Sequence, residues 1–232
     1  MLTVHHLECS QSERIIWLCE ELGIYYELKR YNRNPVFAPP ELKALTPMGG
    51  APVITDSTFD PSNPLTLGES AAIVEYIIHK HGDGRLILPP SHKDYTHYLY
   101  WFHQSNTNLQ GAIFRALLVG QLKLAPENPI QKSVNAKVKA VLNMLNDRLN
   151  RVTWLAGDQF TAADIMTVVS VTTMRLYYPI DLTGYEGILS WLQRVGDRPA
   201  YKSAMQKGDP EMAPCLGAAT PDLFPAWAAI VQ

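Results

Sequence analysis

The hydrophobic pattern of this chain changes near Gly82, and this change limits the folds that the chain can adopt. Before Gly82, short stretches with the two-residue period of strands alternate with amphipathic helical stretches. After a proline-containing stretch at residues 86–93, every periodic segment is helical. The order in the first part is β-α-β and then β-β-α, which predicts one right-handed parallel crossover followed by a hairpin. We therefore expect an α/β domain over residues 1–85, a linker over residues 86–93, and an all-α domain over residues 94–232.

The spacing of apolar residues predicts the individual elements. In the stretch 10–22, Ile15 and Leu18 fall on one helical face, and Gly23 is placed to end that helix. The stretch 161–177 is apolar on most sides, which is typical of a buried helix. Four strands are expected: residues 1–6, residues 25–31, a strand that begins at residue 53, and residues 65–67. Helices are expected at residues 10–22 and 39–43, from residue 68 onward, and at residues 94–124, 130–151, 161–177, 188–196 and 200–207. The apolar segment after residue 213 is broken by prolines and is expected to be a surface tail.

Composition excludes several classes of protein. The net charge is −2, and charged residues make up 18% of the 232 residues, so the chain lacks the basic balance that a nucleic-acid partner favours. The sequence has no uninterrupted apolar run of about 18 residues and no signal-peptide pattern, so neither a transmembrane helix nor secretion is expected. Three cysteines without metal-ligand spacing indicate a reduced, cytoplasmic compartment and predict no metal site.

The stretch 44–56, ALTPMGGAPVITD, combines a turn with the start of a strand. Proline lacks a backbone N–H, so Pro52 should lie at the first residue or the edge of that strand. Xaa-Pro is also the common place for a cis peptide bond. A cis bond between Ala51 and Pro52 would turn the N–H and C=O groups of Ala51 outward, where an extended peptide ligand could pair with them. The alternative is an ordinary loop entering a strand.

Glu69 and Ser70 lie where the last helix of the first domain is expected to begin. Free N–H groups and the helix dipole at such a position favour an anion such as a carboxylate, and the Ser70 hydroxyl adds a donor. Glu69 could receive an ammonium group. Acidic and hydroxyl residues are also common at ordinary helix starts, so this pattern alone leaves both interpretations open.

Ser10, Ser12 and Cys9 precede the first helix. The serines could cap that helix, or one hydroxyl could donate a hydrogen bond to a bound thiolate. A thiol has a pKa of about 8.5, and lowering it by about 2 units requires roughly 2.7 kcal/mol of preferential thiolate stabilisation. A charge-assisted hydrogen bond at a positive helix end can supply much of that energy. Cys9 is the one conceivable protein nucleophile here, although a small buried apolar role is favoured because no Cys-x-x-Cys partner is present.

Thr161 and Asp164 fit a capping box ahead of the apolar stretch 161–177. Thr161 would accept a hydrogen bond from the first turn, and Asp164 would reach back to the Thr161 N–H. The predicted role of the pair is structural.

Taken together, four segments resemble the cytosolic glutathione transferases in order and spacing, over nearly the whole chain. They are SQSERIIWLCEELG at 10–23, ELKALTPMGGAPVI at 41–54, LGESAAIVEYI at 67–77 and FTAADI at 160–165. The WLCEELG segment and YLYWFHQ at 98–104 look most like a fungal or bacterial branch, theta-like or yeast-type. The resemblance implies a thioredoxin-like N-terminal domain, an all-helical C-terminal domain and a homodimer. It also implies a cytoplasmic detoxification enzyme that joins the thiolate of glutathione to hydrophobic electrophiles, with glutathione as co-substrate, no other cofactor, and glutathione peroxidase activity as a further expectation.

The resemblance assigns roles to residues of the first domain. The spacing of Ser10 and Arg14 matches theta-like enzymes that carry a catalytic serine at the position of Ser10. Ser12 is its nearby competitor and an expected glutathione contact. Glu69 and Ser70 match the pair that holds the γ-glutamyl end of glutathione.

Pro52 matches the cis-proline of the family, and Ala51 is the residue before it. The backbone at that position binds the cysteinyl unit of glutathione. Gly50 stands where relatives often carry Lys or Arg to meet the glycyl carboxylate, and Arg33 or Lys43 would have to take over that role.

Phe102, Asn106 and Gln110 are the candidate residues of the hydrophobic substrate site in the helical domain. Asn106 stands where similar sequences tend to have Glu, so the chemistry of that site is not carried over. Two alternatives remain: a non-catalytic module that binds glutathione for regulation, and a thiol transferase that depends on Cys9.

Overall fold

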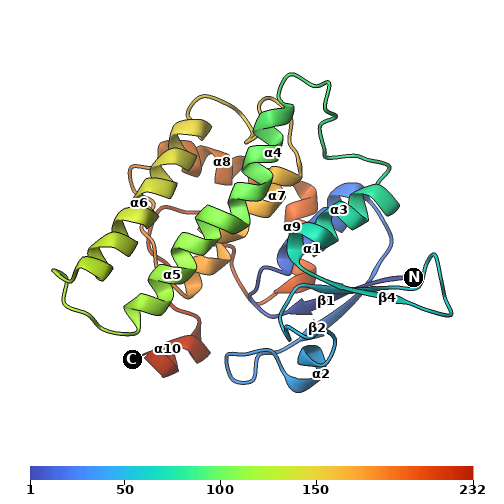
Figure 1. Cartoon of the computed structure of the whole chain (residues 1–232), viewed down its shortest axis with the longest axis horizontal. Coiled ribbons are helices and arrows are strands. Elements are labelled where there is room, and N and C mark those ends of the chain that lie inside the picture. The colour runs from blue at the N-terminus through green and yellow to red at the C-terminus, as the bar shows by residue number, and fades with distance from the viewer. Residues whose placement is uncertain (232) are drawn as a thin grey trace. The chain divides into compact units, whose positions relative to one another are not determined.

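The computed structural model describes residues 1–231, which divide into two compact units (Figure 1). Unit 1 comprises Met1–Ile87 together with Asp197–Pro214, and unit 2 comprises Leu88–Gly196 and the stretch from Cys215 onward. The sequence analysis assigned residues 197–214 to the helical domain. The structure instead joins them to unit 1, because the helix that they form packs along the first helix of the chain.

Unit 1 is built on a four-stranded mixed sheet with the strand order β2-β1-β3-β4. The strands are β1 (Leu2–Leu7), β2 (Glu27–Tyr31), β3 (Val53–Asp56) and β4 (Leu65–Gly68). β1 and β2 are parallel, whereas β1–β3 and β3–β4 are antiparallel. In β1, Val4 pairs with Leu28 of β2 on one side and with Ile54 of β3 on the other. The predicted parallel crossover followed by a hairpin is confirmed.

Four helices belong to unit 1: α1 (Glu13–Leu22), α2 (Pro40–Lys43), α3 (Ser70–Lys80) and α9 (Pro199–Gly208). Gly23 ends α1 in the left-handed conformation, with φ of 62°. α9 packs against α1, and the rings of Trp17 and Tyr201 meet edge-on there with their centroids 5.0 Å apart. Arg198, the residue before α9, donates two hydrogen bonds to the Glu21 carboxylate. These contacts make α9 part of the core of unit 1.

The helices of unit 2 are α4 (Tyr95–Gln104), α5 (Gly111–Gly120), α6 (Pro129–Leu149), α7 (Ala162–Val168), α8 (Glu186–Asp197) and α10 (Pro225–Val231). α5 packs along α6, and α4 packs on α7 (Figure 1). The helix expected at 94–124 is divided by a π-helical segment, Ser105–Gln110. The helix expected at 161–177 is shorter than predicted, because α7 ends at Val168 and is followed by 3₁₀ turns at Val169–Val171 and Thr173–Leu176.

The break after α7 is centred on Thr172, which has φ of −123° and ψ of −94°. Its hydroxyl donates to the carbonyl oxygen of Val168 at 2.9 Å, a local bond that competes with regular helix. At the start of α7, Thr161 and Asp164 form the predicted reciprocal capping box. The tail is more regular than expected, since it ends in α10, where the Trp227 indole N–H donates to the Tyr177 carbonyl.

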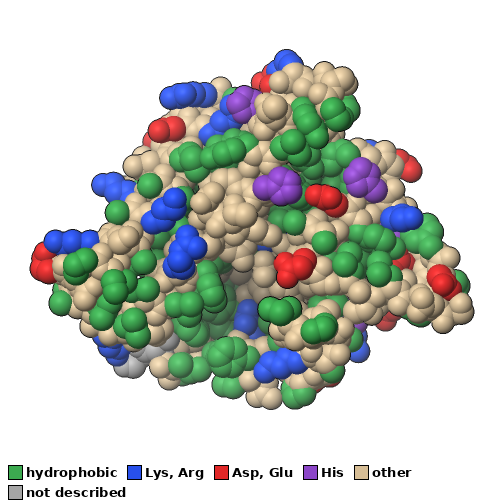
Figure 2. All heavy atoms as spheres, viewed as in Figure 1, with side chains coloured by type: hydrophobic (Ala, Val, Ile, Leu, Met, Phe, Trp, Pro, Cys, Tyr) green, Lys and Arg blue, Asp and Glu red, His purple; other side chains and the backbone are tan. Residues whose placement is uncertain are grey.

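Within residues 1–231, no helix is both long enough and apolar enough to span a bilayer. On the face drawn in Figure 2, Lys and Arg side chains are spread in separate groups between hydrophobic and neutral surface.

Candidate functional site

Ser10 and Ser12 lie in the turn between β1 and α1, and their hydroxyl groups contact each other. The two Oγ atoms are 2.7 Å apart, and the Ser12 backbone N–H donates to Ser10 Oγ at 3.2 Å. Ser10 is half-buried, whereas Ser12 has no exposed surface. Neither serine side chain caps α1; instead Ser12 Oγ accepts the Leu7 backbone N–H at 3.1 Å. Ser10 is therefore the serine whose hydroxyl can face a ligand in this conformation.

Two further buried residues, His6 and Asp209, continue the hydrogen bonding of the two serines into the interior of unit 1. Ser12 Oγ lies 2.9 Å from Nδ1 of His6, and Nε2 of His6 lies 3.1 Å from Oδ2 of Asp209. The other Asp209 oxygen, Oδ1, accepts the Cys9 backbone N–H at 2.9 Å. His6 comes from β1 and Asp209 from the end of α9. The packing of α9 on α1 thus places a carboxylate behind the serine turn.

Cys9 is a structural residue of this turn. Its φ of 45° is unusual for a residue with a side chain. The Arg33 guanidinium donates to the carbonyl oxygens of Glu8, Cys9 and Val36, which fixes the backbone on that side. Burial, followed by the nearby Asp209 carboxylate, raises the pKa of the Cys9 thiol to about 12. At neutral pH the thiol is protonated, so it is a poor nucleophile.

Gln11 and Arg14 connect the serine turn to the other two parts of the predicted glutathione site. The Gln11 amide donates to the Ala51 carbonyl oxygen at 3.0 Å. Nη1 of Arg14 donates to Gln11 Oε1 at 3.0 Å and to Ser70 Oγ at 3.3 Å. Arg14 is completely buried, and this burial lowers the pKa of its guanidinium to about 9. The turn that carries Ser10 is therefore tied to Ala51 and Ser70, although the three residues are far apart in the sequence.

The N-terminus of α3 carries Glu69 and Ser70 as predicted. Glu69 is exposed and has φ of 70°, a conformation that residues with side chains rarely adopt. Such local strain persists where the surrounding structure imposes it, often at binding sites. Ser70 is buried as the first residue of an 11-residue helix. The positive end of the helix dipole at this point favours a carboxylate.

The turn before β3 agrees with the sequence analysis in its backbone. The Ala51–Pro52 bond is cis, as predicted, and Asn34–Pro35 is a second cis bond that was not predicted. A side chain at Gly50 would project into open space. Of the two cations considered there, Arg33 is committed to backbone carbonyls, as described above. Lys43 is exposed, and its stem lies 3.4 Å from the Cβ position of Gly49.

The candidate substrate residues of unit 2 lie at a change of helix type. Phe102 is buried at 1% exposure and packs against the rings of Tyr98 and His103, so it is a core residue rather than a lining residue. Asn106 and Gln110 are half-buried on the π-helical segment. A π-helical segment is uncommon and frequently marks a functional site.

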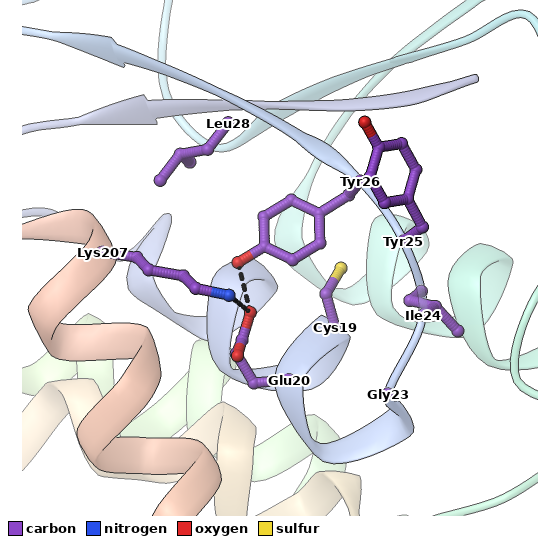
Figure 3. Close-up of a pocket in the computed structure, with 8 residues that line it drawn as sticks. All are labelled: Cys19, Glu20, Gly23, Ile24, Tyr25, Tyr26, Leu28 and Lys207. Atoms are coloured by element: carbon purple, nitrogen blue, oxygen red, sulfur yellow. Dashed lines mark hydrogen bonds and ion pairs between the residues drawn. The ribbon is translucent and has the colours of Figure 1, made fainter.

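Unit 1 also has a pocket of about 450 Å³ that is not formed by the predicted site residues (Figure 3). Its main polar groups satisfy one another, because the Glu20 carboxylate accepts from Tyr26 and Lys207 at 2.6 Å each. Cys19 is fully buried beside them. In the part of the chain that the structure describes, no group of three His, Cys, Asp or Glu side chains is arranged to hold a metal ion.

The sequence analysis missed His6, Gln11 and Asp209 as members of the site. Gln11 lay inside the recognised SQSER segment but had no assigned role. His6 is 203 positions from Asp209 in the chain, so no local spacing could have paired them. Arg14 was noted only for its spacing from Ser10.

Comparisons with known proteins agree with this geometry. The family model described as "Glutathione S-transferase, N-terminal domain" matches residues 8–80, and "Glutathione S-transferase, C-terminal domain" matches residues 98–199. Glutathione S-transferase 3 of Schizosaccharomyces pombe is 32% identical over 222 residues, which cover 89% of this chain and 88% of that protein.

Two crystal structures have the same fold. A glutathione S-transferase from Actinobacillus pleuropneumoniae superposes with a TM-score of 0.79 at 31% identity and covers 93% of this chain and 99% of its own. A glutathione transferase from Burkholderia graminis, which has two glutathione molecules bound per subunit, superposes with a TM-score of 0.70 at 22% identity. That match covers 91% of this chain and 89% of the Burkholderia chain.

Proposed function

This chain belongs to the glutathione S-transferase family, and on that premise we propose that it transfers glutathione to small hydrophobic electrophiles. In the reaction, the glutathione thiolate forms a sulfur–carbon bond and the leaving group of the electrophile departs with its electron pair. The observation that carries this proposal is the placement of the Ser10 hydroxyl, which is half-buried in the turn before α1. Gln11 and Arg14 tie this turn to Ala51 and Ser70.

We assign the parts of glutathione to three segments of unit 1. The γ-glutamyl carboxylate would lie at the N-terminus of α3, where the Ser70 hydroxyl and backbone N–H groups donate to it. Its ammonium group would face the exposed Glu69 carboxylate. The cysteinyl backbone would pair with Ala51 beside Pro52. Lys43, whose stem lies beside Gly49, would meet the glycyl carboxylate. Ser12 has no exposed surface, so its proposed role is to support Ser10 from behind.

The Ser10 hydroxyl would activate the sulfur by hydrogen bonding. A free thiol with a pKa of about 8.5 is mostly protonated at neutral pH, and a decrease of about 2 units corresponds to roughly 2.7 kcal/mol of preferential thiolate stabilisation. A short O–H···S⁻ bond near the positive end of α1 contributes in the required direction.

The remaining parts of the proposal concern the second substrate and the assembly. The electrophile would be held by residues of unit 2, with Asn106 and Gln110 as candidates. Detoxification in the cytoplasm, peroxidase activity, and turnover without another cofactor belong to the same proposal. Twofold symmetry is the commonest arrangement of soluble oligomers, and we propose a homodimer. Sedimentation of a 26.0 kDa species at micromolar concentration would contradict the dimer.

The catalytic assignment is tested with three variants in a conjugation assay against a reactive aryl halide. Ser10→Ala should lose turnover, raise the apparent thiol pKa by about one to two units, and still bind glutathione. Cys9→Ala should keep turnover, because the Cys9 thiol is buried and protonated. Ser62→Ala is the matched control, since this exposed hydroxyl donates only to Asp60.

Parallel assays separate the alternatives. Retention on glutathione resin without conjugation by the unmodified protein would favour the non-catalytic module. Mixed-disulfide reduction that disappears in Cys9→Ala would move the function to that cysteine. Full conjugation activity in Ser10→Ala would refute the role of Ser10.

A further inference from the structure

Behind Ser10, three buried polar side chains of unit 1, those of Ser12, His6 and Asp209, form a hydrogen-bonded chain. Ser12 Oγ is 2.7 Å from Ser10 Oγ, His6 Nδ1 is 2.9 Å from Ser12 Oγ, and Asp209 Oδ2 is 3.1 Å from His6 Nε2. Ser12 and His6 have no exposed surface, and Asp209 is 4% exposed. Glutathione does not need these three groups as direct contacts. Burying a polar atom costs free energy unless the atom has a hydrogen-bond partner. This continuous hydrogen-bonded chain therefore requires an explanation.

The partners of each atom decide where the protons lie. The Asp209 carboxylate only accepts, so His6 must donate to it from Nε2–H. A neutral imidazole then has a lone pair on Nδ1, which must accept the Ser12 hydroxyl proton. Ser12 Oγ already accepts the Leu7 N–H. Its own proton is assigned to His6 Nδ1 at 2.9 Å, because the other acceptor in reach, the Leu7 carbonyl oxygen, is farther away at 3.4 Å. Ser10 therefore donates its hydroxyl proton inward to Ser12. The Ser12 backbone N–H already donates to Ser10 Oγ at 3.2 Å, which leaves one Ser10 lone pair to accept from outside.

This arrangement cannot stabilise a thiolate until the protons shift, because Ser10 initially offers an acceptor to the ligand. A glutathione thiol can donate its S–H to Ser10 Oγ. The reverse orientation, with Ser10 donating outward, requires Ser12 to donate to Ser10 and His6 to donate to Ser12. In that state His6 carries protons on both nitrogens.

We propose that Ser12, His6 and Asp209 form a proton relay that receives the glutathione thiol proton through Ser10. The inference rests on the proposed function. The thiol proton passes to Ser10 Oγ, the Ser10 proton passes to Ser12 Oγ, and the Ser12 proton passes to His6 Nδ1. A thiol and a neutral imidazole become a thiolate and an imidazolium, and no proton is gained from or lost to solvent. The same shift turns the Ser10 hydroxyl toward the sulfur.

The surroundings of His6 suit a proton acceptor. The turn before α1 presents Ser12 to the ring, and the end of α9 presents Asp209. Gly208 leaves room there, since a side chain at that position would meet both His6 Nε2 and Ile16. The Asp209 carboxylate contacts the ring at 3.1 Å and would compensate the charge of an imidazolium. Cys9 adds no charge at neutral pH, because burial raises its pKa to about 12. The charged groups around the Cys9 turn are Glu8, Glu13 and Arg33.

Counting protons tests the relay in the unmodified protein. Ultraviolet thiolate absorbance measures how much bound glutathione is ionised, and titration calorimetry in buffers of different ionisation enthalpy measures how many protons reach the solvent. The relay predicts thiolate formation with far fewer than one proton released per thiolate. One proton released per thiolate would overturn the relay and leave the role of Ser10 intact. Failure to bind glutathione or to form thiolate would overturn the proposed function and the relay together.

Asp209→Asn is the sharpest variant, because the Cys9 N–H fixes its orientation. The amide oxygen must face the Cys9 N–H, so the amide N–H₂ faces His6 Nε2 and forces the proton to Nδ1. His6 can then no longer accept a proton from Ser12, although the side chain keeps its shape. We expect proton release to rise to one per thiolate, because the thiol proton must then pass to the solvent.

Ser12→Ala should likewise raise proton release to one per thiolate, because it removes the hydroxyl that links Ser10 to His6. Thr167→Val is the matched control: its hydroxyl is also fully buried and donates to the Ala163 carbonyl in unit 2. The control should change neither the thiol pKa nor the proton count. Unchanged proton release in correctly folded Asp209→Asn and Ser12→Ala proteins would overturn the relay.

Discussion

Asp164 should be among the most sensitive polar positions for the stability of unit 2. Its carboxylate has no exposed surface and accepts three hydrogen bonds: from the Thr161 backbone N–H at 3.1 Å, from the Leu155 backbone N–H at 3.0 Å, and from the Trp191 indole N–H at 3.0 Å. Leaving a buried donor without an acceptor costs about 1–3 kcal/mol. Asp164→Ala leaves three such donors, so the expected loss is roughly 3–9 kcal/mol. That loss is a large share of a typical unfolding free energy of about 5–15 kcal/mol.

Two milder variants set the expected order. Asp164→Asn keeps one oxygen for Leu155 and Trp191 but turns its amide toward the Thr161 N–H, so it should cost about 1–3 kcal/mol. Thr161→Ala removes the hydroxyl that accepts backbone N–H groups of the first turn of α7, including that of Ala163, and should cost about 0.5–2 kcal/mol.

Urea unfolding at one protein concentration measures these differences, with an unchanged m-value required for each comparison. Asp158→Ala is the control, because the Asp158 side chain is 83% exposed and should affect stability by less than about 0.5 kcal/mol. A loss below about 1 kcal/mol for Asp164→Ala, or equal losses for Asp164→Ala and Asp164→Asn, would refute the reasoning. Glutathione affinity should not change in any of these variants.

Three further outcomes are expected. Ser70→Ala should weaken glutathione binding by about 1.5–3 kcal/mol if Ser70 donates to a carboxylate, and an unchanged Kd in calorimetry would contradict that contact. Gly50→Lys should tighten binding by about 0.2–1 kcal/mol, because the side chain enters open space beside the proposed glycyl carboxylate; weaker binding would count against that placement. Burial alone raises the pKa of Asp56, but hydrogen bonds from Thr58 and His81 bring it down to about 2 from 3.8. The stability that Asp56 contributes is therefore complete above about pH 4 and is lost as the pH falls toward 2, so Asp56→Asn should flatten the acid-unfolding curve in that range.

Periodicity predicted the parts of the fold that depend on local pattern. The strand and helix order of unit 1 follows from alternating and amphipathic stretches, and the capping box before α7 follows from two residues three positions apart. The same argument overestimated helix length, because the spacing of apolar residues does not show where the backbone changes from α-helical to π-helical or 3₁₀ hydrogen bonding. The π-helical segment after Gln104 and the break at Thr172 keep apolar residues in the core while the hydrogen-bond pattern changes.

The candidate site was predictable only where the chain concentrates its residues in short segments. Ser10, the Ala51–Pro52 turn and Ser70 each stood in a recognisable local pattern. His6 and Asp209 did not, because a histidine in a strand and an aspartate after a helix have many ordinary roles. Their relation depends on the packing of α9 against α1, which is a tertiary contact without a local signature.

The two-part construction of unit 1 has a consequence for how the protein is made. All four strands and the serine turn leave the ribosome early, but Tyr201, Arg198 and Asp209 are synthesised only after the whole of residues 88–196. Until then, Trp17 lacks the ring that covers its edge, and the imidazole of His6 lacks its carboxylate. The helix that covers α1 and the hydrogen-bonded chain behind Ser10 are therefore completed only after the intervening helical segment 88–196 has been synthesised.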